Sequence, residues 1–144
     1  MPKDKSKGDT QYAVIPWRIG TAGKPEVMLL TSRETRRWVI PKGWPMKGKK
    51  PAQAAAQEAY EEAGLVGEIA GKRPIGTYHY SKRTDQGDVL CEVRVYLLRV
   101  EKQLEDWPEK QQRLTAWFDA SKAAELVNEG ALALIIAGLA TSFI

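Results

Sequence analysis

Residues 41–65 read PKGWPMKGKKPAQAAAQEAYEEAGL, and this stretch carries the strongest structural signals in the chain. A basic segment comes first, and a run of good helix formers from 52 to 63 follows it, between Pro51 and Gly64. Proline suits the first position of a helix, and glycine suits the position just past its end. The stretch therefore predicts a basic loop that leads into a helix over residues 52–63.

The predicted helix carries three glutamates on one face. Glu58, Glu61 and Glu62 are spaced i, i+3 and i+4, which places them within an arc of about 100°. We expect the helix to present these carboxylates outward and to pack by its other face. That other face contains Ala52, Ala56, Ala59, Tyr60 and Ala63. Mg²⁺ or Mn²⁺ would relieve the repulsion between the acids, although an ordinary solvated acidic face explains the spacing equally well.

The segment before the helix is rich in basic side chains. Between residues 33 and 50, seven bases stand against the single acid Glu34: Arg33, Arg36, Arg37, Lys42, Lys47, Lys49 and Lys50. Cations beside a metal-binding acidic helix are what a polyphosphate substrate requires. The last three lysines are better explained as solubilising surface residues than as contacts, whereas Lys42, between Pro41 and Gly43, is favoured as a contact.

The order of the other predicted elements indicates the fold class. Strands come before the helix, more strands follow it, and two helices close the chain. This order favours an α/β fold, an α/β/α sandwich with a mixed sheet, over strict β-α-β alternation. The patterns predict strands over 11–19, 27–31, 38–40, 76–82, 89–100 and 116–118, and helices over 121–128, capped by Gly130, and 131–140.

Length and composition indicate one folded domain. The chain has 144 residues, 43% of them hydrophobic, and we expect a flexible basic tail over 1–10 and a single domain over 11–144. The net charge of +4 suits an anionic ligand and argues against a dedicated nucleic-acid binder.

Neither terminal segment resembles a targeting or membrane-spanning sequence. Residues 1–8 lack a secretory h-region, and the apolar stretch 131–144 is too short to span a bilayer. We expect a cytoplasmic protein without a membrane partner, as a monomer or homodimer. Cys91, the single cysteine, is interpreted as a buried structural thiol rather than a nucleophile.

The helix and the loop before it carry a family resemblance. Pro41-Lys42-Gly43, followed by QEAYEEAGL over 57–65, resembles the Nudix box of the Nudix hydrolases. The residues that match the box at its spacing are Gly43, Glu58, Glu61, Glu62, Gly64 and Leu65. The box is degenerate, because Lys49 stands where it has a glutamate, Gln57 where it has an arginine, and Ala59 where it has a larger aliphatic. The family's fold implies the same α/β/α sandwich.

The resemblance implies a metal-dependent active site. Glu58, Glu61 and Glu62 would bind Mg²⁺ or Mn²⁺, with the Gly43 carbonyl as a further ligand. One of these glutamates, or a carboxylate outside the box, would act as the base on the attacking water. Glu92 is the main outside candidate, because strand alternation places it with Arg94 and Tyr96, although a paired surface glutamate is an equal alternative. Glu105 and Glu109 are harder to place.

The resemblance also suggests a phosphate-rich small-molecule substrate. The chain looks most like the branch that hydrolyses diphosphoinositol polyphosphates and dinucleoside polyphosphates. Arginine suits bidentate recognition of phosphate, and lysine binds it as a point charge. The candidate phosphate contacts are Arg18, Arg33, Lys42, Lys82, Arg83 and Arg113. His79, between two tyrosines, is interpreted as structural in preference to substrate binding.

Two other functions stay open at this point. One is a housekeeping hydrolase directed to nucleoside triphosphates. The other is a Nudix-like binding module with weakened turnover, which Lys49 and Gln57 suggest and the three glutamates oppose. RNA 5′-end processing is a minor option, because the chain has no aromatic-rich basic stripe.

Overall fold

A mixed β-sheet forms the centre of the protein. The computed structural model describes residues 9–142, and in this range eight strands make one sheet. The elements in chain order are β1 (Thr10–Ile19), β2 (Pro25–Thr31), β3 (Trp38–Val39), β4 (Lys42–Gly43), α1 (Pro51–Ala63), β5 (Leu65–Ile69), β6 (Gly76–Thr84), β7 (Gly87–Gln103), the short 3₁₀ helix η1 (Lys110–Gln112), β8 (Thr115–Asp119), α2 (Ala120–Leu126) and α3 (Gly130–Thr141).

The strands β1 and β7 hold the sheet together. They pair in parallel from Thr10↔Glu92 to Trp17↔Arg99, and the other pairings are antiparallel. The path through the sheet is β3-β2-β1-β7-β5, while β4 pairs with β1, β6 with β7 and β8 with β2. Strand β1 therefore pairs with β4 near its start and with β2 near its end.

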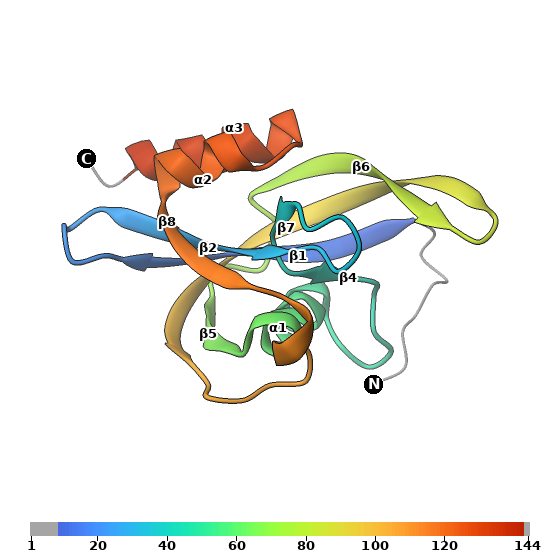
Figure 1. Ribbon diagram of the computed structural model, residues 1–144, viewed down its shortest axis with the longest axis horizontal. Helices are drawn as coiled ribbons and strands as arrows, with labels where there is room; N and C mark the ends of the chain where they lie inside the picture. Colours follow the sequence, from blue (N-terminus) through green and yellow to red (C-terminus); the bar gives the residue numbers. More distant parts are fainter. Residues whose placement is uncertain (1–8, 143–144) are drawn as a thin grey trace.

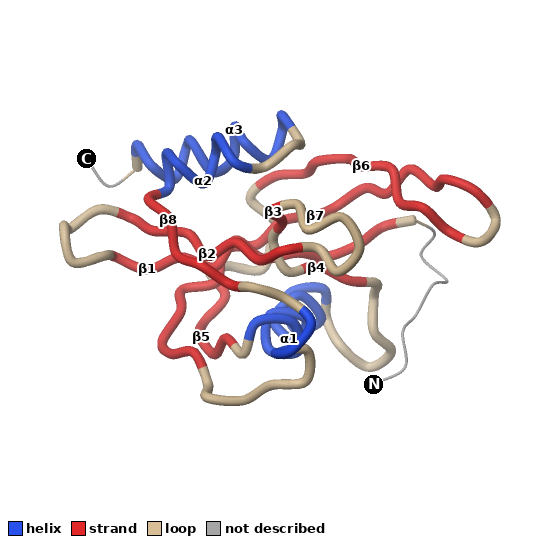
Figure 2. The backbone as a smooth tube through the Cα atoms, in the orientation of Figure 1, coloured by secondary structure: helices blue, strands red, loops and turns tan. Residues whose placement is uncertain are grey.

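Helices cover both faces of the sheet (Figures 1 and 2). On β1, Ala13 and Ile15 pack in the core on the side of α2 and α3, whereas Tyr12 and Val14 pack in the core on the side of α1. This alternation is the two-residue period of a strand that is buried on both faces. The predicted α/β/α sandwich is confirmed.

Helix α1 begins and ends where its sequence signals predict. The Lys50 backbone N–H donates to Gln53 Oε1 at 2.9 Å, and Gly64 ends the helix in the left-handed conformation with φ of 69°. The predicted orientation was wrong for two of the glutamates, because Glu58 and Glu62 lie on the buried face with Ala59 and Ala63. On the predicted packing face, Ala52 and Ala56 are half-buried, and Tyr60 is 38% exposed.

Some other elements also differ from the prediction. Lys42–Gly43 pairs with β1 as a strand instead of forming a loop, and β5 was not predicted. Gly130 begins α3 rather than ending α2. In the predicted tail, residues 1–8 lie outside the described residues, and Thr10 already belongs to β1. Within residues 9–142, no helix is long and apolar enough to cross a membrane.

The bulge between β5 and β7 provides a test of the sheet. A β-carbon at Gly67 would lie 2.0 Å from the carbonyl oxygen of Arg99, so the backbone itself would have to shift. We expect Gly67→Ala to lower the free energy of unfolding by about 2 kcal/mol. Gly138→Ala is the matched control, because Gly138 lies in α3 with open space around it, and it should stabilise by roughly 0.5–1 kcal/mol. Urea unfolding measures both, and equal effects would contradict the close approach.

Candidate active site

The site is built where α1 crosses β4. A β-carbon at Gly43 would lie 1.8 Å from Glu58 Oε2, so the glutamate side chain occupies the space that any other residue at this position would fill. Glu58 is only 4% exposed. The two halves of the motif, the glycine and the glutamate helix, are therefore in direct contact in the fold.

Glu62 lies one turn further along the same face and is 6% exposed. Burial raises the pKa of the Glu62 carboxyl well above its usual range, and the nearby Arg113 guanidinium acts against that rise. The charge of Glu58 adds to the rise, because a second carboxylate disfavours ionisation of the first. Two buried acids thus lie within electrostatic reach of each other.

Arg113 connects these acids to the rest of the site. Its Nη2 lies 3.9 Å from Glu62 Oε1, and its Nε donates to Glu109 Oε1 at 2.9 Å. A third contact runs from Nη1 to the carbonyl oxygen of Thr31 at 3.2 Å. The Arg113 side chain is 10% exposed, so this guanidinium is a largely buried hub between α1, β2 and the segment before β8.

Glu61 is held by neutral partners. Its Oε2 accepts a hydrogen bond from Gln57 Nε2 at 2.9 Å, and its backbone oxygen accepts one from the N–H of Glu109 at 2.9 Å. Gln57, where the motif has an arginine, therefore still orients a glutamate of the box. Glu109, which the sequence left unplaced, comes next to both Glu61 and Arg113.

The donor set fits a hard divalent cation in its chemistry. Across residues 9–142, no three histidine, cysteine or acidic side chains come together as a ready-made metal site. Glu58 and Glu62 are nevertheless two buried carboxylates, and the charge of Glu58 adds to the cost of ionising Glu62, a cost that an oxygen-seeking cation would offset. Glu61 and the Gly43 carbonyl are further oxygen donors of the motif.

Lys42 brings positive charge to the same place from β4. Burial lowers the pKa of the Lys42 ammonium, whereas the carboxylate of Glu62 acts to raise it. Its Nζ lies 4.9 Å from the centre of the Tyr80 ring, a cation–π arrangement. The charges of Lys82 and Arg113 also act on it. Two of the other predicted phosphate contacts, Lys82 and Arg113, are thus within electrostatic reach of Lys42.

The other predicted contacts are less closely grouped. Arg18 pairs with Glu26 at 2.8 Å, six residues along β1 from Tyr12, which pairs with Gly43, and this separation corresponds to roughly 20 Å. Arg83 lies exposed near the tip of the β6–β7 hairpin. Arg33 lies in the β2–β3 loop and reaches Gln112 Oε1 with Nη1 at 3.2 Å, beside Arg113.

Glu92 lies on β7 as predicted, on the sheet face that α1 covers. Its Oε1 accepts from Arg94 Nε at 2.8 Å, and its side chain is 39% exposed. This hydrogen bond raises the pKa of the Arg94 guanidinium. Glu92 therefore has the character of the paired glutamate that the sequence left open. Cys91 is buried and His79 is exposed.

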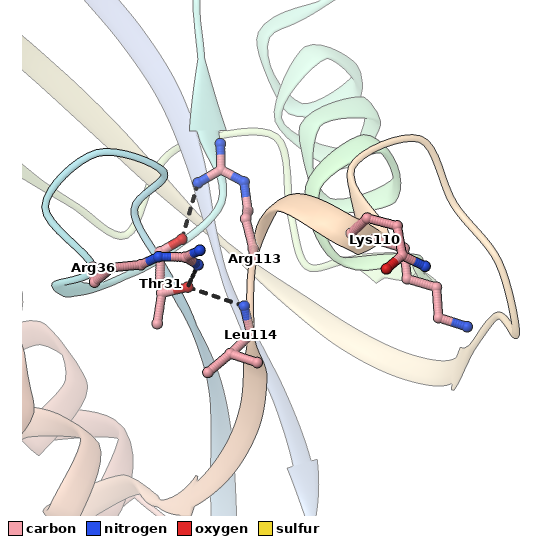
Figure 3. A pocket seen from close by; sticks show the side chains of 6 residues that line it. Thr31, Arg36, Lys110, Arg113 and Leu114 are labelled. Carbon is pink, nitrogen blue, oxygen red and sulfur yellow. Dashed lines mark hydrogen bonds between the residues drawn. The ribbon is translucent and has the colours of Figure 1, made fainter.

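The sequence prediction missed an arginine-lined cavity beside Arg113. The cavity has a volume of about 520 Å³ and is lined by Thr31, Arg36, Lys110, Gln111, Arg113 and Leu114 (Figure 3). Arg36 was counted among the bases of its segment without a role, and Lys110 was not singled out. These residues come together only because the β2–β3 loop folds against η1, and no local sequence pattern predicts that contact.

Comparisons with known proteins agree with this architecture. The NUDIX domain profile matches residues 10–136. The chain is 34% identical over 144 residues to Nudix hydrolase 12, mitochondrial, of Arabidopsis thaliana, a match that covers 86% of this chain and 70% of that protein. It is 32% identical over 106 residues to diphosphoinositol polyphosphate phosphohydrolase 3-alpha of Homo sapiens, covering 72% of this chain and 60% of that protein.

Solved structures share the fold at low sequence identity. The Escherichia coli dihydroneopterin triphosphate pyrophosphohydrolase superposes with a TM-score of 0.71 at 19% identity, covering 92% of this chain and 94% of that one. The Ap4A hydrolase binary complex of Caenorhabditis elegans gives a TM-score of 0.64 at 19% identity, covering 89% of this chain and 92% of that one. At this identity the likeness concerns the arrangement of helices and strands.

The buried carboxyl of Glu62 makes stability depend on pH. Its folded-state pKa lies above the ordinary value of 4.5, so between the two values the native state binds more protons than the unfolded state. The free energy of unfolding therefore falls as pH rises through that window. We expect Glu62→Gln to be more stable than wild type near neutral pH without divalent metal, and to lose that advantage below about pH 4.

Urea unfolding in a chelating buffer at a series of pH values measures this difference. Glu68→Gln is the control, because Glu68 is an exposed glutamate on β5 and should leave the pH profile of wild type unchanged. A Glu62→Gln variant that is less stable than wild type at neutral pH would contradict the assignment.

Proposed function

We propose that this chain, which belongs to the Nudix hydrolase family, is a divalent-metal-dependent pyrophosphohydrolase that cleaves a diphosphate bond in a phosphate-rich small molecule. The observation that carries the proposal is the contact of Glu58 with Gly43, with Glu62 buried beside it and Arg113 against Glu62. Buried acids bordered by cations are suited to binding a metal and a polyanion together.

Glu58, Glu61 and Glu62 would hold Mg²⁺ or Mn²⁺, with the Gly43 carbonyl as a further ligand. When bound, such an ion supplies charge neutralisation at the phosphoryl oxygens and a lower pKa for the attacking water. Gln57 orients the Glu61 carboxylate by the hydrogen bond between their side chains. Lys42 and Arg113 both interact electrostatically with the carboxylate of Glu62. These two cations would attract the phosphates of the substrate.

The general base has two candidates with different surroundings. Glu61 is half-buried and oriented by Gln57, whereas Glu92 is partly exposed and paired with Arg94. A base needs to be within hydrogen-bond reach of the water that the metal binds. We take Glu61 as the better candidate, because a neutral amide orients its carboxylate, whereas an arginine already pairs with the carboxylate of Glu92.

The substrate class follows from the cations around the acids. We propose a diphosphoinositol polyphosphate or a dinucleoside polyphosphate, because such molecules carry several phosphates beyond the hydrolysed bond. The likeness to the human diphosphoinositol polyphosphate phosphohydrolase 3-alpha supports the first of these. We also propose a cytoplasmic location and a monomeric or homodimeric state. The similar Arabidopsis thaliana protein is named mitochondrial, so cell fractionation is the test of the location.

A binding module with weakened turnover is the second candidate, and Lys49 is the observation that favours it. Lys49 replaces an acid of the motif, and no ion pair joins it to another residue between 9 and 142. Gln57 opposes this alternative, because it keeps a hydrogen bond to Glu61 without an arginine.

Turnover assays distinguish the enzyme from the module. The substrates are a diphosphoinositol polyphosphate, a dinucleoside tetraphosphate, a nucleoside triphosphate and ADP-ribose, each with Mg²⁺ or Mn²⁺. We expect metal-dependent product release, and a decrease in kcat/KM of at least about 100-fold in Glu61→Gln. Glu68→Gln should retain wild-type activity.

Two further variants assign the base. Glu92→Gln should lose less than about tenfold in kcat/KM, since Glu92 is paired with Arg94 outside the acid pair. A much larger loss in Glu92→Gln with Mn²⁺ affinity intact would make Glu92 the base. Mn²⁺ binding without hydrolysis of any of the four substrates would favour the binding module.

A further inference from the structure

We propose that the cavity between the β2–β3 loop and η1 is a phosphate subsite, with Arg36 as its principal contact, that binds a phosphate of the substrate away from the hydrolysed diphosphate. The inference rests on the proposed function in one respect, because it takes the acids of α1 as the place of hydrolysis. The cavity itself is defined by Thr31, Arg36, Lys110 and Arg113, together with Gln111 and Leu114.

The backbone at Arg36 is the first observation. Arg36 has φ of 57°, and between residues 9 and 142 it is the only residue other than glycine with a positive φ. This conformation costs free energy for a residue with a long side chain, and such strain collects at functional sites. The loop holds it by backbone hydrogen bonds, from Arg36 N to Ser32 O at 3.1 Å and from Ser32 N to Arg37 O at 2.8 Å.

The strained backbone directs the Arg36 guanidinium toward the cavity. Its Nη1 donates to Thr31 Oγ1 at 3.3 Å and to the carbonyl oxygen of Gln112 at 3.2 Å. Arg113 approaches Thr31 from the other wall, as Figure 3 shows. Both partners of Arg36 are neutral, and among the described residues no carboxylate forms an ion pair with it. A guanidinium has five N–H donors, so Arg36 keeps donors for an anion.

The charge of the lining is the second observation. Three of the six lining residues are cationic and none is acidic. Arg113 is balanced by Glu109 and Glu62, whereas Lys110 donates to the backbone oxygen of Glu105. A cavity of about 520 Å³ with this lining is large enough for a phosphate group with its water.

The position of the cavity identifies which phosphate it binds. Arg113 lines the cavity and also lies 3.9 Å from Glu62, so one guanidinium separates the subsite from the acids. A ligand with its diphosphate at the acids would place another phosphate on the far side of Arg113. The subsite therefore favours substrates with phosphates beyond the scissile bond over those with a lone diphosphate.

The test measures binding without turnover. Calorimetric titration with inositol hexakisphosphate in a chelating buffer uses a probe that has six phosphates and no diphosphate to cleave. We expect Arg36→Gln and Arg36→Gly to weaken the affinity about tenfold. Glycine adopts a positive φ without strain, so Arg36→Gly keeps the loop while it removes the guanidinium, and thermal unfolding checks that both variants fold.

Arg73→Gln is the control, because Arg73 is an exposed arginine of the β5–β6 connection that lines neither this cavity nor the smaller one beside it. It removes the same charge and should change the affinity less than twofold. The subsite would be overturned by unchanged affinity in both Arg36 variants, by an equal loss in Arg73→Gln, or by a wild-type protein that does not bind the probe. The same titration with ATP compares a ligand whose phosphates surround a ring with one whose phosphates form a linear chain. Arg36→Gln should weaken the binding of whichever ligand the cavity holds.

Steady-state kinetics separate this inference from the proposed function. In Arg36→Gln, KM for a diphosphoinositol polyphosphate should rise about tenfold, whereas KM for ADP-ribose, which has no phosphate beyond its diphosphate, should stay within twofold. Binding that depends on Arg36 in a protein that hydrolyses none of the substrates would support the subsite and overturn the hydrolase. Equal changes of KM for both substrates would overturn the subsite alone.

Discussion

The burial of a glutamate side chain against a bare stretch of backbone is the constraint on which the rest of the structure depends. Glu58 fits only because Gly43 has no side chain, and Gly43 lies there only because β4 pairs with Tyr12 and Ala13 of β1. The alanines of α1 allow the helix to approach the sheet closely enough to make this contact. A motif that is separated by fifteen positions in sequence thus becomes one contact in the fold.

Burying acids requires cations to be buried with them, and this requirement organises the surrounding segments. An isolated buried carboxylate is costly, whereas one with a cationic neighbour is tolerated. Arg113 supplies that neighbour for Glu62, and it also bonds Glu109 and the backbone of Thr31. The segment before β8 is therefore fastened to α1 and to β2 by the same side chain that the acids require. Arg113 therefore both balances charge at the site and holds the surrounding segments of the chain together.

Local patterns predicted the elements whose signals lie within them. Helix α1 was predicted from Pro51, Gly64 and its alanines, and the long strands from their β-branched residues. Strand β5 was missed because Gly67 interrupts a short apolar run, and that glycine is required by the Arg99 backbone, which is distant in sequence. The predicted orientation of Glu58 and Glu62 was wrong because it, too, depends on a residue that is distant in sequence. A helical wheel treats acids as solvent-facing, and only the glycine on the neighbouring strand reverses this.

The degenerate positions of the motif can be compared with the contacts that their side chains make in the fold. Position 57 holds a glutamine in place of the motif's arginine, and position 49 holds a lysine in place of its glutamate. Glutamine at position 57 adds no charge, and its neutral amide still donates to the Glu61 carboxylate at 2.9 Å. The substitution at position 57 therefore keeps the Glu61 carboxylate oriented. Spacing alone identifies the departures, but the role that the side chain keeps at position 57 depends on a hydrogen bond that only the folded helix makes.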